Sequence, residues 1–426
     1  MDSVSFGLIG KAAGFLVPIA VAARYGISAD TDALYLAMAV TQLLVAVFAQ
    51  GLEQYLIPFY VQAGGGSDSR ARLRWATLRA LIAAMGAWVA GLPLIWLLAT
   101  HAAAAMGTRL PLLLYLLLAP QVVAAAFTAC HSSYLMAHGD FRWPPASIGL
   151  RAAGVLGAIA LAPAGSGIAP LAIGFSAGEL LRALALALLT HRQLRAQPAF
   201  TTTLAIPSGS LRRGLWQLGS VALLGVAPLI ERSLAALLAP GGVTTLEYAS
   251  KLFYVAATIF DTNFAAVFVR TWAVEVRDQR WRLLGQDVRR WVTFVGLSAV
   301  VVAVIAVFAR EPIVHLALAR GQFTARNSHA VASLFAILML AYPFAAVGML
   351  LGGLVVALHE TRALFQVSAL KMAVRSVAAL GLGTLAGLPG IAAALVIMHA
   401  TEVGFLAWTG RRTVRVRRAG TFTAPA

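Results

Sequence analysis

Long apolar runs follow one another along nearly the whole chain, each bounded by charged residues, glycine or proline. A helix needs about 20 mostly apolar residues to cross a bilayer, and runs of this length occur about twelve times. In lipid every backbone amide needs an internal partner, and a helix satisfies its own amides within one segment. The sequence therefore predicts an all-α membrane protein with about 12 transmembrane helices. The predicted spans are 5–24, 32–62, 75–100, 110–137, 144–163, 167–190, 213–238, 245–273, 291–318, 328–357, 363–386 and 388–409.

The composition agrees with a membrane protein. Hydrophobic residues make up 60% of the chain and charged residues 12%, against about 25% charged in soluble domains. A soluble chain would lack the polar surface to cover so much apolar material. The formal net charge of +17 could suggest nucleic acid as a partner. However, the basic residues form short clusters between apolar runs, without interleaved aromatic residues for base stacking, so we exclude nucleic acid.

Arginines alternate between successive connections. Counted from a cytoplasmic N-terminus, every second connection is rich in arginine, with about twenty arginines against about five on the opposite side. Because cytoplasmic loops attract positive charge, this alternation predicts that both termini are cytoplasmic and that the number of spans is even. The arginine-rich set is Arg70, Arg72, Arg74, Arg142, Arg192, Arg195, Arg212, Arg213, Arg270, Arg277, Arg280, Arg282, Arg289, Arg290, Arg362, Arg411, Arg412, Arg415, Arg417 and Arg418.

The chain divides into two similar halves. The polar segment 191–212 reads as a cytoplasmic linker between a six-helix bundle at 1–190 and a second at 213–410, followed by a basic tail at 411–426. A shift of 213 residues places Thr31 on Thr244 and Tyr35 on Tyr248. Two six-helix repeats of equal orientation are related by an axis along the membrane normal, which is typical of transporters. We therefore expect two pseudo-symmetric bundles around a central cavity.

The sequence offers no catalytic or metal centre. Cys130 is the single cysteine, so an intrachain disulfide and a cysteine-built metal site are excluded. The histidines are scattered and form no ligand pair, so we expect no metal and no cofactor. The first apolar run lacks a basic leader and a clean cleavage site, and we interpret it as a retained span.

Charged residues within the predicted spans are the candidate substrate site, because ionisable groups at membrane depth usually face a cavity. Those in the first, second, seventh and eighth spans fall in repeat-equivalent segments, where cations with some acids suit an anionic phosphate or pyrophosphate group. Internal ion pairing without substrate contact is the alternative. The candidates are Arg24, Asp32, Glu53, Glu231, Arg232 and Lys251. Nearer the span ends, Arg79, Arg151, Arg182 and Lys371 are interpreted as side chains that reach the interface.

Three stretches carry a resemblance to a known family. The first runs from Gly14 to Pro58 and includes A-R-Y-G, T-D-A and F-A-Q-G; the second is A-H-G-D-F-R-W-P-P-A at 137–146. The third joins E-P-I-V at 311–314 to R-G-Q-F-T at 320–324 and A-L-H-E-T-R at 357–362. Together they resemble the MurJ (MviN) family of lipid II flippases, within the MOP superfamily of multidrug, oligosaccharidyl-lipid and polysaccharide exporters. The resemblance covers about residues 5–410.

The resemblance implies two bundles that open alternately to the two sides of a bacterial inner (plasma) membrane. It implies transport of a polyprenyl-pyrophosphate-linked saccharide to the periplasm during peptidoglycan assembly, with membrane lipids and cell-envelope biosynthesis proteins as partners. It also implies a pyrophosphate-binding role for arginines of the cavity. Arg24 and Asp32 match family residues, and Lys251 stands where the family usually has arginine.

The chain departs from the family pattern at several positions. Pro18 replaces a central arginine of the family, and Val45 and Ala46 replace two basic residues. Gln50 replaces a glutamate of the family, and we keep Gln50 as a candidate substrate-binding residue. The chain also has twelve predicted spans where many relatives have fourteen. In the repeat alignment Pro18 overlies Glu231, so Arg232 could supply the lost cationic contact. A flippase for another lipid-linked glycan, such as an exopolysaccharide or O-antigen unit, therefore fits about as well.

Other functions fit the sequence less well. A cation-coupled multidrug exporter would need a more acidic and aromatic cavity. A membrane enzyme would need placed catalytic groups in a large outer loop, and the segment 310–327 has no carboxylate pair. A scaffold in a larger complex, without transport activity, is a further alternative. Coupling to the membrane potential, Na⁺ or H⁺ is undecided, with Asp32, Glu53 and Glu231 as candidate ion sites.

Overall fold

The computed structural model describes residues 2–61, 67–106, 110–163, 165–195, 210–261, 264–358 and 360–418. Throughout these ranges the chain forms helices and their connections, with no strand, so the predicted all-α class is confirmed. By Cα proximity the chain groups into two compact units. Unit 1 is Met1–Thr244 with Leu318–Thr324, and unit 2 is Thr245–Ala317 with Ala325–Ala426.

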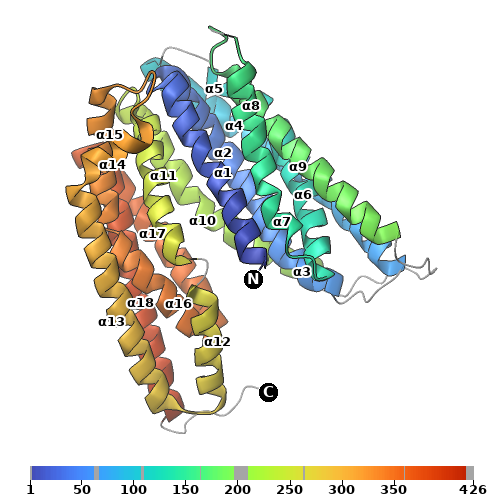
Figure 1. The fold of residues 1–426 in the computed structure, drawn as a ribbon, viewed down its shortest axis with the longest axis vertical. Helices are drawn as coiled ribbons and strands as arrows, with labels where there is room; N and C mark the ends of the chain where they lie inside the picture. Colours follow the sequence, from blue (N-terminus) through green and yellow to red (C-terminus); the bar gives the residue numbers. More distant parts are fainter. Residues whose placement is uncertain are drawn as a thin grey trace. The chain divides into compact units, whose positions relative to one another are not determined.

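Unit 1 contains ten α-helices and one π-helix in its described part. They are α1 (Asp2–Tyr25), α2 (Ala29–Ala46), η1 (Val47–Gly51), α3 (Leu52–Val61), α4 (Ser67–Met106), α5 (Leu110–Leu117), α6 (Ala119–Ala137), α7 (Trp143–Ala146), α8 (Ile148–Leu161), α9 (Ala169–Arg195) and α10 (Ser210–Leu238). Figure 1 labels the α-helices. Here α2, η1 and α3 follow one another without a break and correspond to the predicted span 32–62.

Unit 2 begins at Thr245, in the first turn of α11. Its described helices are α11 (Gly242–Asp261), α12 (Phe264–Arg277), α13 (Trp281–Phe308), α14 (Arg310–Leu318), α15 (Ala325–Met339), α16 (Tyr342–Ala357), α17 (Thr361–Ala386) and α18 (Leu388–Arg418). Each predicted span of the chain coincides with one helix or with a run of consecutive helices.

The number of membrane spans is consistent with the prediction. Within the described ranges nine helical segments are long and apolar enough to cross a bilayer, or ten if the bent pair α15 and α16 counts as one span. The stretch Gly14–Tyr25 of α1 is a shorter apolar helix. The count of twelve stays a prediction, as do the bundle boundaries at 190 and 213.

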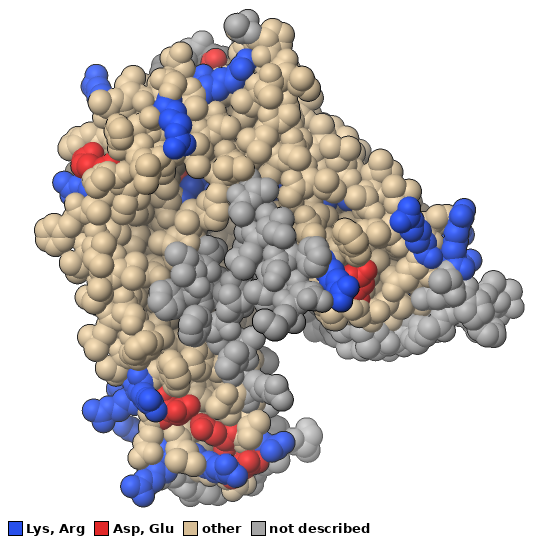
Figure 2. All heavy atoms as spheres, in the orientation of Figure 1, with Lys and Arg blue, Asp and Glu red and all other residues tan. Residues whose placement is uncertain are grey.

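Large apolar side chains cover the outside of several helices. On α4, Leu78 and Ile82 are 61% and 64% exposed, and Leu297 on α13 is 64% exposed. Soluble monomers rarely expose contiguous apolar surface of this kind. On the face in Figure 2, Lys and Arg gather toward helix ends and leave a broad surface without charge. These helices therefore present their apolar faces to lipid, where such exposure is favourable.

Small residues set the packing of α8 against α9. A Cβ atom added at Gly178 would lie 2.5 Å from the carbonyl oxygen of Arg151, and one at Gly174 would lie 2.6 Å from the Cβ of Ala158. A Cβ at Gly154 would overlap Gly178 itself. Between lipid-embedded helices such small residues let the backbones approach closely, because dispersion and backbone contacts replace the hydrophobic effect as the source of association.

Helix boundaries repeat at the offset read from the sequence. Helices α1 and α10 end at Tyr25 and Leu238, and α2 and α11 begin at Ala29 and Gly242. Both pairs have the 213-residue separation that also relates Thr31 to Thr244. The two helical hairpins are therefore equivalent in position. Most of the predicted linker and the last residues of the predicted tail lie outside the described residues.

Candidate functional site

Arg24 lies in the last turn of α1 and binds the end of α8. Its guanidinium donates to the carbonyl oxygens of Ala162 and Pro163, at 2.6 and 3.0 Å. The last carbonyls of a helix have no partner within the helix and carry partial negative charge, so a cation is favourable there. In this conformation Arg24 therefore caps a helix, and its role toward substrate stays a prediction.

Asp32 lies in the first turn of α2 and is fully buried. Its carboxylate accepts from the backbone amides of Gly241 and Thr244, at 2.6 and 2.8 Å. The Thr244 hydroxyl lies 2.6 Å from the same carboxylate and 3.0 Å from the Thr31 hydroxyl, so its single proton serves one or the other. A carboxylate at a helix N-terminus satisfies amides that lack intrahelical partners. Asp32 therefore fixes the first turn of α11 to α2.

Gln50 and Glu53 lie at an irregular part of the helix that follows α2. Gln50 belongs to the π-helix η1, although its side chain lies outside the described residues. Glu53 follows in the first turn of α3, is half-buried, and interacts electrostatically with Arg182. Short π-helical turns are rare and are frequent at functional sites. A Cβ at Gly51 would lie 2.9 Å from Leu218, so α10 passes close to this turn.

Glu231 and Arg232 lie in α10, one turn after Pro228. Glu231 is 6% exposed and Arg232 is half-buried. Proline lacks an amide proton, so the carbonyl four residues earlier loses its helical partner and the helix is locally weakened. The predicted pair thus lies next to a weak point of a span.

Lys251 belongs to unit 2 and pairs with an acid on its own helix. Its ammonium lies 3.3 Å from Glu247 Oε1, one turn earlier on α11. The Glu247 side chain is only 3% exposed, whereas that of Lys251 is 44% exposed. A glutamate four residues before a lysine is the favoured order on a helix. Lys251 thus keeps a cationic group partly accessible above a buried carboxylate.

The structure divides the predicted site residues between the units. Arg24, Asp32, Glu53, Glu231 and Arg232 belong to unit 1, and Lys251 belongs to unit 2. The shared cavity proposed for them stays a prediction. Within unit 1, Asp32 accepts hydrogen bonds from the start of α11, which the hydropathy of the sequence did not predict.

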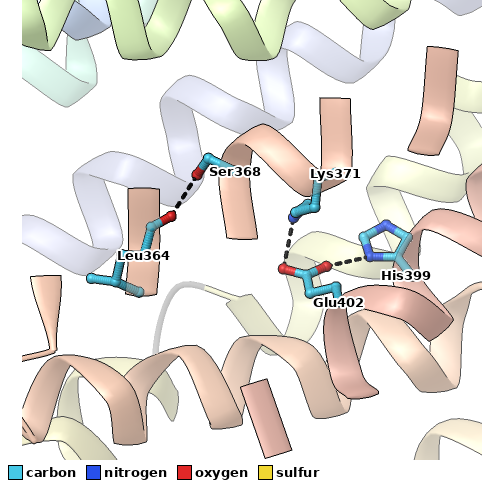
Figure 3. A network of polar contacts seen from close by, with 5 residues as sticks. All are labelled: Leu364, Ser368, Lys371, His399 and Glu402. Carbon is cyan, nitrogen blue, oxygen red and sulfur yellow. Dashed lines mark hydrogen bonds and ion pairs between the residues drawn. The ribbon is translucent and has the colours of Figure 1, made fainter. Parts of the chain in front are cut away.

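A polar cluster between α17 and α18 was missed by the sequence analysis (Figure 3). Glu402 Oε1 accepts from the Lys371 ammonium at 2.7 Å, and Glu402 Oε2 lies 2.8 Å from His399 Nδ1. Lys371, interpreted from the sequence as a side chain reaching the interface, instead makes an ion pair. A Cβ at Gly348 of α16 would lie 3.3 Å from the carboxyl carbon, so this glycine leaves room for the acid. The sequence signal that could have indicated this cluster is Glu402 within the predicted span 388–409, three residues after His399.

A second cluster lies between α8 and α9 in unit 1. Arg182 makes an ion pair with the fully buried Glu179 at 3.2 Å, and its Nε donates to the Ser147 hydroxyl at 3.0 Å. Arg151 interacts electrostatically with both members of the ion pair. Arg182 was also interpreted as reaching the interface, and the structure pairs it internally. Both clusters keep charge inside the membrane by matching it, which lowers the cost of placing it there.

The apolar helices of the described ranges, long enough to cross a bilayer, define a polytopic membrane protein. A sequence model described as "Lipid II flippase MurJ" matches residues 21–424. The chain belongs to the MurJ family of lipid II flippases, as the sequence resemblance indicated, and is a transport protein rather than an enzyme.

Solved structures share the fold. A lipid II flippase MurJ in an inward closed conformation superposes with a TM-score of 0.81 at 16% identity, covering 99% of this chain and 94% of that chain. An inward-facing MATE multidrug transporter of the MOP superfamily gives 0.74 at 14% identity, covering 98% of both chains. A MOP superfamily transporter from Pyrococcus furiosus gives 0.68 at 13% identity, covering 97% of this chain and 95% of that chain. A search of curated protein sequences found no match.

Proposed function

We propose that this protein is a flippase for a polyprenyl-pyrophosphate-linked saccharide, a lipid II-like peptidoglycan precursor. The observation that carries the proposal is the family match over residues 21–424. The cations held inside the spans support it, because a pyrophosphate crossing a bilayer needs fixed positive charge to replace its hydration. Arg24, Arg232 and Lys251 are the residues we assign to that contact.

The direction that we propose is from the cytoplasmic to the periplasmic leaflet of the inner membrane. The arginine alternation, which predicts cytoplasmic termini, supports this orientation. Lys251, partly exposed beside Glu247, is suited to meet an entering pyrophosphate. Arg24 would have to release the carbonyls of Ala162 and Pro163 to take part, so its contact belongs to a different conformation of α1 and α8.

Alternating access requires that the substrate path close and open on each side of the membrane in turn. Here we consider the end of the protein that contains Asp32. The Asp32 carboxylate, which holds the first turn of α11 against α2 through the backbone amides of Gly241 and Thr244, is suited to keep that end closed. The segment Leu318–Thr324 belongs to the same unit and bonds to the end of α1, where the Gln322 amide donates to the Ala23 carbonyl at 2.8 Å. We assign these contacts to the closed state of the periplasmic side.

The membrane potential is the driving force that we propose. An inside-negative potential favours outward movement of an anion by about 2.3 kcal/mol per charge per 100 mV. Reconstituted vesicles with an imposed K⁺ diffusion potential test this directly. Transport should rise with an inside-negative potential at equal pH and equal Na⁺; transport that follows only a proton or Na⁺ gradient would assign the coupling to that ion.

A binding experiment separates the candidate substrates. The full-length protein in lipid nanodiscs is titrated with lipid II, with a polyprenyl-pyrophosphate-linked O-antigen unit and with a lipophilic cationic drug. We expect the two pyrophosphates to bind and Lys251→Gln and Arg232→Gln each to weaken them about tenfold, the loss of a charge-assisted contact. Arg79→Gln is the matched control, because Arg79 lies over the Trp75 ring at 4.8 Å and has no assigned substrate role.

Each outcome of that titration is informative. Tight binding of lipid II with loss in both span variants supports the proposal. Preference for the O-antigen unit would shift the substrate to another lipid-linked glycan. Binding of the drug alone, or equal affinities in Lys251→Gln, Arg232→Gln and Arg79→Gln, would contradict a pyrophosphate site at these residues.

A further inference from the structure

A pocket of about 390 Å³ lies in unit 2 where α17 begins and α18 ends. It is lined by side chains from both helices and from the residue before α17. The arginine alternation assigns this end of the two helices to the cytoplasmic side of the membrane. The lining includes Glu360, Arg362, Trp408, Thr409, Arg412 and Arg417.

The charge of the pocket is positive. Three arginines and a single carboxylate line it. Arg417 already lies 3.9 Å from Glu360 and donates to the Leu358 carbonyl at 2.7 Å. Glu360 also accepts from the Thr413 hydroxyl at 3.3 Å. The negative charge of the pocket is therefore matched from within, and the exposed Arg362 and Arg412 give it a surplus of positive charge.

A threonine that lines the same pocket is buried. Thr409 is 8% exposed, and its Oγ1 has no hydrogen-bond partner among the described residues. An unsatisfied buried polar atom is unfavourable, and a ligand oxygen that accepts from it would remove that cost. Arginine guanidinium groups and a hydroxyl donor together form a set suited to phosphate oxygens.

The surroundings of the pocket favour a lipid over a soluble anion. Trp408 is 56% exposed, and its ring centroid lies 5.4 Å from the Arg412 guanidinium carbon. Tryptophan is typical of the membrane interface, where its ring meets both acyl chains and headgroups. Basic pockets between spans on the cytoplasmic side are suited to lipid headgroups. We propose that this pocket binds the phosphodiester headgroup of an anionic membrane phospholipid.

The test uses the full-length protein in detergent, with bound lipid counted by native mass spectrometry. Phosphatidylglycerol is titrated against phosphatidylcholine, and inorganic phosphate and glycerol 3-phosphate are added as competitors. We expect phosphatidylglycerol to be retained in preference. Arg362→Gln and Arg412→Gln should each weaken its binding about fivefold, with a larger loss in the double variant. Arg282→Gln/Arg289→Gln, two exposed arginines on α13 outside the pocket, is the matched control.

Three results would overturn the proposal. The first is equal retention of the two lipids by the wild-type protein. The second is an equal loss of phosphatidylglycerol in the pocket variant and the α13 control, which would reduce the effect to general surface charge. The third is full displacement by millimolar inorganic phosphate, which would make the ligand a soluble phosphate. Thr409→Val, which removes the hydroxyl and keeps the arginines, should give a smaller loss; its thermal unfolding in phosphatidylcholine reports any failure to fold.

Discussion

The hydroxyl oxygens of Thr31 and Thr244 lie 3.0 Å apart, and the two threonines are 213 residues apart in the chain, the offset at which the sequence predicts a repeat. The neighbouring position breaks the equivalence, because Asp32 in the first hairpin corresponds to Thr245 in the second. One carboxylate therefore joins the starts of α2 and α11.

The Asp32 carboxylate should contribute strongly to stability. We expect Asp32→Asn to lower the free energy of unfolding by about 1.5–3 kcal/mol, because the amide group has one acceptor oxygen for two buried backbone amides, which also lose a charged partner. Thermal unfolding of the purified protein measures the effect. Asp30→Asn is the control, since Asp30 lies in the same turn and is exposed. Equal unfolding temperatures for the two variants would contradict the assigned role.

The ion pair between Lys371 and Glu402 gives a prediction about charge balance. Glu402→Gln should destabilise the protein by about 3–5 kcal/mol, because it leaves the Lys371 ammonium without its carboxylate partner. Lys371→Met should destabilise it less, because His399 still contacts Glu402. The double variant should recover most of the loss, since it removes both charges. Unfolding measurements on the three variants complete the cycle. Additive losses in the double variant would show that the two side chains act independently.

The close approach of α8 and α9 predicts different responses from two glycines. Gly178→Ala should destabilise unit 1 by about 1–3 kcal/mol, because its Cβ would meet the backbone of Arg151 at 2.5 Å. Gly157→Ala on α8 should be neutral or stabilising by up to about 1 kcal/mol, since nothing lies within 4 Å of its Cβ and alanine favours helix. The same response at both positions, measured by thermal unfolding, would exclude glycine-mediated packing.

Lys251 offers a test of the substrate contact that preserves charge. Lys251→Arg should retain binding of a pyrophosphate-linked lipid, because arginine presents the same charge with two parallel donors. Lys251→Met should weaken binding about tenfold and leave the Glu247 carboxylate without its nearby cation. Affinity in nanodiscs is the measurement. If Lys251→Met binds the lipid as tightly as Lys251→Arg does, Lys251 does not contact the substrate.

The sequence predicted which segments are helical because a span must be apolar along about 20 residues, and hydropathy records this directly. It also predicted the 213-residue offset that the ends of α1 and α10 and the starts of α2 and α11 share. It did not predict the partners of Asp32 or the cluster of Lys371, His399 and Glu402. These depend on the rotation of each helix about its axis and on small residues such as Gly348, which apolar length does not encode.

Rescue of cells depleted of their lipid II flippase tests the central claim most directly. The wild-type gene, Arg24→Ala and Arg79→Gln are expressed at equal levels, and the fraction of lipid II exposed on the outer leaflet is measured as growth is restored. The proposed function predicts rescue and lipid II exposure by the wild type and Arg79→Gln, with loss in Arg24→Ala. A correctly inserted wild-type protein that exposes no lipid II would contradict lipid II transport, and would direct the search to another lipid-linked glycan.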